Sequence, residues 1–282
     1  MSKQKIFLSF LALVFLAALL AVFLFWLEKY GQITAVTFLS VGEGDAILIS
    51  QGQSQILIDG GRSGKELLAH VGRHMPFWDR TVEIVIATHP DADHIGGFTG
   101  LLGAYRVEKF LSTGAQSKTE TFTLLQKALA VRNLEPLKIF RGSSIKLPRG
   151  GELAIEYPLT VLPAEAAETN TGSIVLRFTY GATRILFTGD LPSEETVLPE
   201  IQPADILKVA HHGSRYSTSA AFLDQLQPSE AIISVGKNSY GHPSPDVLQR
   251  LQEHGTVIRR TDTEGDIQYR CTQELSHCVF VY

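Results

Sequence analysis

The N-terminus carries the feature that most limits what this chain can fold into, an uncharged apolar run at residues 6–27. An α-helix rises about 1.5 Å per residue, so this run spans roughly 33 Å, enough to cross a bilayer core of about 30 Å. Signal peptides usually have an apolar core of only about 7 to 15 residues followed by small residues, whereas this run ends in Phe, Trp and Leu. We therefore expect residues 1–31 to be an uncleaved membrane anchor, with a cleaved signal peptide as the alternative.

The charges beside the run predict its orientation. Lys3 and Lys5 precede it, and Lys29 follows it. Basic residues next to a membrane helix tend to stay in the cytoplasm. This bias predicts a single-pass protein of the cell membrane whose residues 32–282 form one domain on the outer, extracytoplasmic face.

Outside the anchor the chain is acidic. Residues 31–282 hold 22 basic and 28 acidic residues, a net charge of −6. This balance excludes a globally basic nucleic-acid-binding protein, so any contact with phosphate must come from local cations. The candidates that lie near the motifs described below are Lys208, Arg215 and Lys237.

Two cysteines, Cys271 and Cys278, flank a short polar segment in a β-rich tail. A hairpin there would place them opposite each other and allow a disulfide in an oxidising compartment, and two reduced thiols are the equal alternative. No second cysteine pair accompanies them to make a zinc site.

His70 and His74 lie four residues apart in a predicted helix, a spacing that can bind zinc. The sequence offers no third ligand near them, so we expect a solvated helix face.

Short apolar runs alternate with helical patterns along the rest of the chain, which predicts a layered α/β domain. Polar residues, among them His and Asp, follow four of the predicted strands directly, where α/β enzymes keep their chemistry. The predicted strands are 35–38, 46–49, 55–58, 84–87, 174–178, 184–187, 206–209 and 231–234, and the predicted helices are 65–74, 120–132, 220–225 and 245–253.

One of these strand ends carries four metal-ligand side chains within six positions, namely His89, Asp91, Asp93 and His94. Pro90 keeps the stretch out of a regular helix interior. No basic residue lies among the four, so their pKa values would shift unless a cation occupied the site. We expect two bound ions, which need a carboxylate between them and further imidazoles from other strand ends.

Seven motifs resemble one known family. They are Val41-Gly42-Glu43-Gly44-Asp45, Leu57-Ile58-Asp59-Gly60-Gly61, the loop from His89 to Gly97, Asn170-Thr171-Gly172-Ser173, Phe187-Thr188-Gly189-Asp190, His211-His212-Gly213-Ser214 and Tyr240-Gly241-His242-Pro243. In this order they resemble the metallo-β-lactamase superfamily, and within it the extracellular domain of ComEC-type DNA-internalisation competence proteins. The resemblance implies an αββα four-layer sandwich with the chemistry of a metal-dependent hydrolase.

The resemblance also implies a set of metal ligands for two divalent ions, Zn²⁺ or Mn²⁺. His89 and Asp91 would bind one ion, Asp93 and His94 the other, with Asp190 as the bridge. His211 would complete the second site. The wider superfamily has His where this chain has Asp91, and a third imidazole where it has Asn170, and the competence group shares both changes. Oxygen-richer ligands shift preference from Zn²⁺ towards Mn²⁺.

Other motif residues are expected to support the ions or the substrate. Asp59 would orient a ligand from behind, and His212 would do the same or serve as an alternative ligand. His242 and Ser214 would contact a phosphate or protonate a leaving oxygen. Asn170 and Ser173 either contribute to the site or only pin a loop beside it. With Asp93 and Asp190, His242 is the candidate for a catalytic role.

Together these features predict a membrane-anchored, metal-dependent hydrolase. We expect a phosphodiesterase or nuclease that acts on DNA or nucleotides in DNA uptake, and that supplies the hydrolase part to a separate channel subunit, since one helix cannot form a pore. The alternatives are hydrolysis of a carbonyl substrate such as a lactone, thioester or β-lactam, and a non-catalytic DNA-capture module with structural metals.

Overall fold

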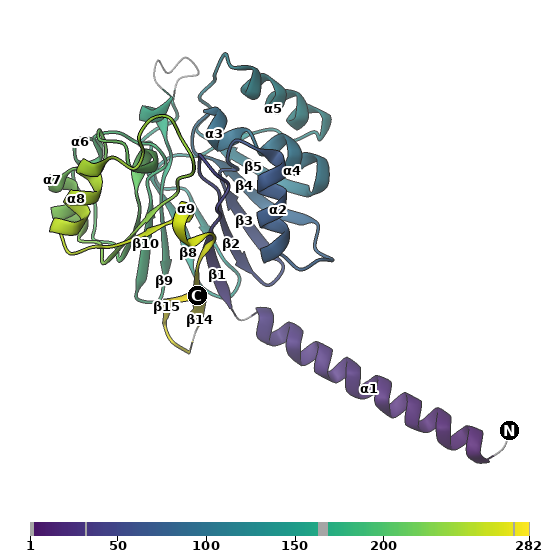
Figure 1. Ribbon diagram of the computed structural model, residues 1–282. Helices are drawn as coiled ribbons and strands as arrows, with labels where there is room; N and C mark the ends of the chain where they lie inside the picture. Colours follow the sequence, from purple (N-terminus) through teal and green to yellow (C-terminus); the bar gives the residue numbers. More distant parts are fainter. Residues whose placement is uncertain (1–2, 32, 163–168, 273, 282) are drawn as a thin grey trace.

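The computed structural model describes residues 3–31, 33–162, 169–272 and 274–281. Two β-sheets pack face to face between two groups of helices (Figure 1). The first sheet has the strand order β15-β14-β1-β2-β3-β4-β5-β6, and the second has β13-β12-β11-β10-β9-β8-β7. Helices α2, α4 and α5 cover the first sheet, and α6, α7 and α8 cover the second. This αββα arrangement confirms the predicted fold class.

The elements of the first sheet and its helices are β1 (Thr34–Phe38), β2 (Ile47–Gln51), β3 (Ser54–Ile58), β4 (Thr81–Ala87), β5 (Arg106–Ser112), β6 (Leu137–Lys138), β14 (Ile267–Thr272), β15 (His277–Val281), α2 (Gly64–His74), α3 (Ala92–Ile95), α4 (Phe98–Ala104) and α5 (Glu120–Val131). Those of the second are β7 (Ser144–Lys146), β8 (Glu152–Tyr157), β9 (Val175–Tyr180), β10 (Thr183–Phe187), β11 (Ile206–Lys208), β12 (Glu230–Ile233), β13 (Val257–Arg260), α6 (Glu194–Val197), α7 (Ala220–Leu226), α8 (Pro245–Glu253) and α9 (Thr261–Glu264). Two 3₁₀ turns, η1 (Asn170–Gly172) and η2 (Ala210–Gly213), and the N-terminal α1 (Lys3–Gly31) complete the set.

Alternation along the strands explains why two sheets form. In β2, Ile47 enters the core between the sheets, whereas Leu48 packs under the helices of the first sheet. In β10, Phe187 faces the other sheet and Leu186 faces the outer helices. Successive side chains of a strand point to opposite faces, so a strand that is apolar at every position is buried on both.

Local signals explain the main helices as well. In α2, the side chain of Ser63 accepts a hydrogen bond from the backbone N of Glu66, which satisfies a donor left free in the first helical turn. Leu67 and Val71, four residues apart, then bury one face of the helix against the first sheet.

The predicted strands and helices all occur, with bounds that differ by at most three residues. The sequence pattern did not reveal β5, β6, β7, β8 and β13, nor the short helices α3, α4, α6 and α9. β6 is only two residues long and both are exposed, and β7 has an exposed, half-buried, exposed pattern over three residues. Strands this short and this exposed show no alternation of apolar and polar residues from which a strand could be predicted.

The N-terminal helix and the cysteine pair bear on two earlier expectations. Residues Lys3–Leu24 are long and apolar enough to cross a membrane, and they are not buried against the domain. Length and composition fit an anchor or a signal sequence equally, so the anchor stays a prediction.

Cys271 and Cys278 lie opposite each other in the antiparallel pair β14 and β15 and form a disulfide.

The expectation of a solvated helix face at His70 and His74 is wrong. His70 is buried, and its Nδ1 lies 2.6 Å from Oδ1 of Asp266, while Nε2 of His74 lies 2.8 Å from Oδ2 of the same carboxylate. Asp266 also accepts a hydrogen bond from the backbone N of Ser40. The two imidazoles therefore tie α2 to the segment before β14, a contact between residues almost 200 positions apart that local sequence cannot reveal.

Candidate metal centre

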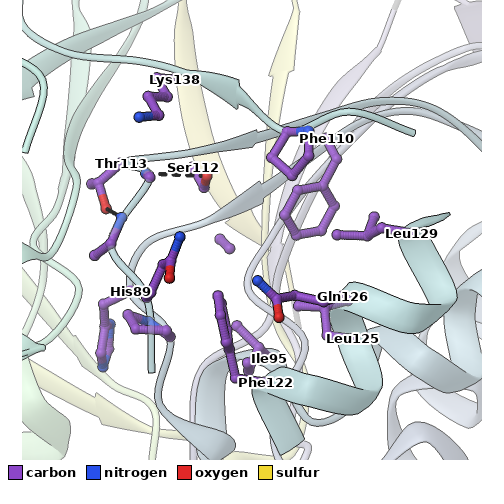
Figure 2. Close-up of a pocket in the computed structure, with 16 residues that line it drawn as sticks. His89, Ile95, Phe110, Ser112, Thr113, Phe122, Leu125, Gln126, Leu129 and Lys138 are labelled. Atoms are coloured by element: carbon purple, nitrogen blue, oxygen red, sulfur yellow. Dashed lines mark hydrogen bonds between the residues drawn. The ribbon is translucent and has the colours of Figure 1, made fainter. Parts of the chain in front are cut away.

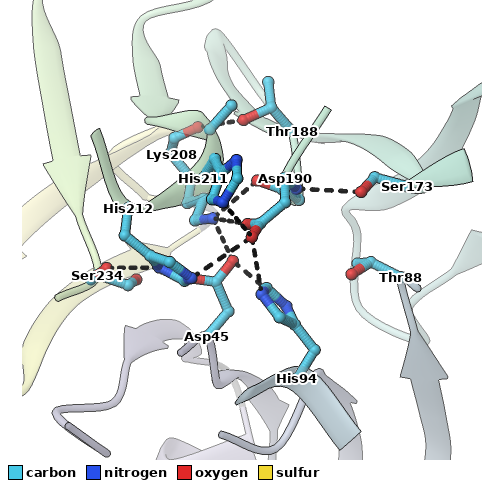
Figure 3. Close-up of polar contacts among 12 residues, drawn as sticks. Asp45, Thr88, His94, Ser173, Thr188, Asp190, Lys208, His211, His212 and Ser234 are labelled. Atoms are coloured by element: carbon cyan, nitrogen blue, oxygen red, sulfur yellow. Dashed lines mark hydrogen bonds and ion pairs between the residues drawn. The ribbon is translucent and has the colours of Figure 1, made fainter. Parts of the chain in front are cut away.

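Strand ends bring the candidate ligands together at one edge of the sandwich. β4 leads into the loop and short helix that hold His89 to His94, β10 leads to Asp190, and β11 leads to η2 with His211 and His212. β10 and β11 are parallel neighbours, so the residues that follow them emerge side by side. Figure 3 shows Asp190 between the imidazoles of His94, His211 and His212.

The backbone at this edge is held in uncommon conformations. Asp59, His211 and His212 have φ of 56°, 49° and 54°, the left-handed region that non-glycine residues seldom adopt. Gly44 has φ of 114°, and a Cβ there would lie 1.9 Å from the carbonyl oxygen of Asp93. Only glycine allows the loop before β2 to pack this closely on the metal loop.

Three buried imidazoles are oriented in the same way. Nδ1 of His94 donates to Oδ2 of Asp59 at 2.8 Å, and Nδ1 of His212 donates to the carbonyl of Ser234 at 2.9 Å. The hydroxyl of Thr88 donates to Asp59, so it can only accept from Nδ1 of His89, which lies 3.0 Å away. Each ring therefore turns Nε2 to the centre, where it can bind a cation once it carries no proton.

Those Nε2 atoms surround one oxygen. Oδ2 of Asp190 lies 3.3 Å from Nε2 of His94, 3.5 Å from that of His212, 3.9 Å from that of His211 and 4.0 Å from that of His89. Oδ2 of Asp93 lies 3.7 Å from Nε2 of His212. The 3.3 Å contact is close enough for an ion pair but lacks the alignment of a hydrogen bond.

Most of the buried polar atoms that lack a hydrogen-bond partner, among the residues the structure describes, gather here. They include Nε2 of His89, His94 and His212 and Oδ1 of Asp190. Buried polar groups are almost always satisfied, and each exception calls for an explanation such as a missing ion. Imidazole and carboxylate donors facing one space fit divalent cations.

A buried lysine supplies one positive charge of its own. Lys208 is fully buried at the end of β11, where its Nζ forms an ion pair with Asp45, donates to the carbonyl of Gly189 at 2.9 Å and lies 3.7 Å from Oδ1 of Asp190. Asp45, Asp59 and His94 also lie close together, so that two carboxylates and an imidazole meet on the inner side of the centre. Lys208 balances one of the two carboxylates, Asp45, and Nδ1 of His94 binds the other, Asp59. The expectation that Lys208 contacts phosphate is therefore wrong.

The charges shift the pKa values of the centre in opposite directions. Burial lowers the pKa of His94, but the carboxylates of Asp190 and Asp59 outweigh burial and hold it well above its usual value. Burial alone raises the pKa of Asp190, and His94, His212 and Lys208 reverse this to hold it well below its usual range. Burial lowers the pKa of His89 well below its usual value, with the charge of His94 acting in the same direction. Without metal, a proton on His94 therefore balances the carboxylates.

The remaining residues of the predicted set lie around this cluster. Oδ2 of Asp91 lies 3.9 Å from Nε2 of His89, on a side chain that is 36% exposed. The hydroxyl of Ser173 accepts a hydrogen bond from the backbone N of Asp190 at 3.1 Å and lies 3.4 Å from Nδ1 of His89, so it pins both. Ser214 is buried, and its Oγ accepts from the backbone N of Tyr216.

The two histidines of η2 and the later His242 differ in how deep they lie. His212 is buried and close to both Asp93 and Asp190, whereas His211 is near Asp190 with its side chain 32% exposed. The ring of His242 lies 5.5 Å from that of His211, at the edge of the centre. Burial lowers the pKa of His242, and His211 lowers it further.

Two contacts of the centre escaped the sequence analysis. The first is the pair of Asp45 and Lys208, for which a lone lysine in an apolar strand was the available signal, because a buried charge needs a partner. The second is Arg62, which is half exposed and lies 3.8 Å from Oδ2 of Asp93 and 3.7 Å from Oε2 of Glu43. Nothing in its local sequence marks it.

Family comparison decides what this geometry belongs to. The family model described as the metallo-beta-lactamase superfamily matches residues 39–237. The chain belongs to the metallo-beta-lactamase superfamily. Membership of this superfamily makes it a metal-dependent hydrolase. The matched residues include every predicted metal ligand.

Curated relatives and solved structures agree with the family. The chain is 35% identical to ComE operon protein 3 of Bacillus subtilis over 264 residues, which cover 83% of this chain and 33% of that protein. It is 27% identical to Competence protein ComA of Neisseria gonorrhoeae, covering 83% of this chain and 32% of that protein. The chain thus spans about a third of the length of these relatives. The metallo-beta-lactamase fold protein YhfI of Bacillus subtilis superposes with a TM-score of 0.58 at 12% identity, covering 84% of this chain and 100% of that one. The expected likeness to competence proteins is confirmed.

Proposed function

We propose that the chain is a membrane-anchored, metal-dependent phosphodiesterase that acts on DNA or nucleotides in DNA uptake. The observation that carries the proposal is the set of three buried imidazoles whose Nδ1 atoms are bound by the protein and whose Nε2 atoms, unpartnered among the described residues, face Asp190. The similarity to competence proteins supports DNA as the substrate.

Two divalent ions fit this ligand set. His89 and Asp91 would hold one ion together with Asp190, and Asp93 and His94 would hold the other with the same bridge. For the remaining imidazole of the second ion, burial and its 3.7 Å distance to Asp93 favour His212 over the more exposed His211. Bound there, the ions would supply an activated water and neutralise charge on the phosphate.

The protein's own groups divide the other tasks. Asp59 and Ser173 fix the rings and the bridge from behind, so the ligands need no reorganisation during the reaction. The lowered pKa of His242 keeps its ring neutral near pH 7, which suits it to take a proton from an attacking water more than to give one to the leaving oxygen.

A surface cation and exposed aromatic rings suit a nucleic acid. Arg62 lies at the mouth of the centre beside Asp93, where it would contact a phosphate oxygen. Tyr240 is 67% exposed and stacks on His242 with the ring centroids 5.8 Å apart. Exposed aromatic faces of this kind stack on the bases of single strands.

The anchor would hold this centre at the cell surface. We propose that residues 1–31 anchor the domain of residues 32–282 on the extracytoplasmic face, as the lysines before the run favour. A disulfide between Cys271 and Cys278 suits an oxidising compartment. The described residues hold one candidate span, and we propose that a separate channel subunit works with this domain to take up the strand.

The test uses the full chain in detergent micelles, loaded with Mn²⁺ or Zn²⁺. We expect cleavage of bis(p-nitrophenyl) phosphate and of single-stranded DNA. Asp190→Asn should lower the rate at least about a thousandfold, since it removes several kcal/mol of charge stabilisation. Asp224→Asn is the matched control, because Asp224 is an exposed carboxylate on α7 whose partner is His254.

Three outcomes would overturn the proposal. Turnover of nitrocefin or a lactone with no diester cleavage would assign a carbonyl substrate instead. DNA binding without any cleavage would assign a capture module. Unfolding of Asp190→Asn, with no hydrolysis by the wild type, would assign a structural role to the metals.

A further inference from the structure

A cavity of about 280 Å³ lies beside the metal centre, at the carboxyl ends of β4 and β5. Its walls come from the metal loop, through His89 and Pro90, from the segment that follows β5, and from α5. Figure 2 shows Phe122, Leu125 and Gln126 of α5 on one side of this space and Ser112 and Thr113 on the other. Ligands of α/β proteins bind outside the carboxyl ends of the strands, where this cavity opens.

The floor of the cavity is apolar and aromatic. Phe110, Leu125 and Leu129 are buried in the core under α5, and the half-buried Phe122 packs against the same core. A floor made of two phenyl rings and two leucines suits the flat, apolar face of a ring.

The rim is polar. The side-chain amide of Gln126 points into the space, and Gln116 and Lys138 line it as well. Gly114 has φ of 84°, and a Cβ there would lie 2.6 Å from Cε of Lys138, so the lysine stem lies across this glycine and carries its ammonium to the rim. Amides that donate and accept, beside one cation, suit a ring with polar edges that is attached to a phosphate.

His89 joins the cavity to the metal centre. Its Nε2 lies 3.9 Å from Asp91 and 4.0 Å from Asp190, while the residue also lines the cavity. A group held in the cavity therefore lies one residue away from the phosphate that the centre would hydrolyse.

We infer that this cavity binds one unpaired nucleobase next to the scissile phosphodiester, an inference that rests on the proposed function. The apolar floor suits a flat ring, the polar rim suits polar edges on that ring, and the neighbouring metal centre suits a ring that is linked to a phosphate. A base can enter only when it is out of a duplex, so the cavity selects single-stranded DNA over paired DNA.

The kinetic test compares two diesters with the same leaving group, the p-nitrophenyl ester of thymidine 5′-phosphate and p-nitrophenyl methyl phosphate. The full chain should favour the first in kcat/KM by about tenfold or more, the range that stacking one base provides. Gln126→Trp fills the mouth of the cavity and should remove this preference while the methyl ester is cleaved as before. Lys127→Trp is the control, because the same ring is placed at the next, exposed position of α5, outside the cavity.

Calorimetry provides a readout that needs no turnover. The metal-free full chain and Lys127→Trp should bind thymidine 5′-monophosphate alike, and Gln126→Trp should bind it at least about tenfold more weakly. Ribose 5-phosphate, which lacks the base, should bind equally to all three.

The two proposals fail in different ways. Nucleotide binding that Gln126→Trp weakens, without cleavage of either diester, would sustain the cavity and overturn the phosphodiesterase. Cleavage of both diesters with equal kcat/KM, or equal nucleotide binding by Gln126→Trp and Lys127→Trp, would overturn the nucleobase site and leave the phosphodiesterase standing.

Discussion

The two sides of the metal centre are built differently. The inner side consists of Asp45, Asp59, His94, Lys208 and His212, all at most 3% exposed and bound to one another or to the backbone. The outer side consists of His89 and Asp91: the ring of His89 is as buried as those of the inner side, but the carboxylate of Asp91 is 36% exposed, and His89 and Pro90 line a cavity. The protein thus settles the charges of the inner side itself and leaves the outer side open, where a substrate can approach.

The largest effect should come from breaking the inner side. Lys208→Met leaves the buried carboxylate of Asp45 without its cation and should lower the free energy of unfolding by about 3–5 kcal/mol. Urea denaturation followed by circular dichroism measures this for the full chain in detergent.

A double variant tests the cause of that loss. Lys208→Met with Asp45→Asn removes both charges and should recover most of the lost stability, which a double-mutant cycle reports as coupling. Equal losses in the single and double variants would mean that packing of the lysine stem, rather than its charge, stabilises this side.

The second prediction compares the groups behind the ligands. Asp59→Asn should weaken metal binding about 10–100-fold, because the carboxylate fixes the ring of His94. Ser173→Ala, on the side of His89, should weaken it less, since that ring keeps Thr88 as a partner at 3.0 Å. Competition with a chromophoric chelator measures both affinities, and equal losses would remove the distinction between the sides.

The third prediction concerns pH. Asp190 and Asp59 outweigh burial and raise the pKa of His94, so the ion-free protein holds a proton that a metal must displace from Nε2. His212 has a raised pKa as well, because Asp190 and Asp93 outweigh its burial, so a second proton must leave. Metal affinity should therefore rise with pH by up to about a hundredfold per unit while both rings are protonated, and level off above their raised pKa values. The pKa of His89 is lowered, so its protonation contributes nothing to this slope near neutral pH. Affinity measured by calorimetry from pH 6 to 9 checks this, and a flat profile contradicts it.

The smallest effect should come from adding a ligand to the outer side. Asn170→His supplies the imidazole that the wider superfamily has and should shift the preference from Mn²⁺ towards Zn²⁺ by a few fold. Metal analysis after loading from an equimolar mixture reports the ratio. An unchanged ratio would place residue 170 outside the reach of the ion.

The sequence predicted the metal loop, which supplies ligands to both sides, but not the pair of Asp45 and Lys208 on the inner side. His89, Asp91, Asp93 and His94 lie within six positions, and their identity alone indicates a metal loop. His212 is more deeply buried than its neighbour His211 because of the left-handed backbone of η2, and no residue pattern predicts that conformation.

Long-range contacts account for the rest. Lys208 and Asp45 are more than 160 positions apart and meet only because β2 and β11 lie in sheets that pack face to face. The same holds for Asp266 with the histidines of α2, and for the cavity, whose walls come from four separate segments. Periodicity predicts which residues are buried, but it does not say which of them meet.

The central claim is that the buried Nε2 atoms around Asp190 face divalent ions. Anomalous diffraction from crystals of the full chain grown with Mn²⁺ tests it most directly. The account predicts two peaks that share Asp190, with His94 and His212 as ligands of one and His89 of the other. Ordered waters at those nitrogens and no anomalous peak beside Asp190 would contradict it.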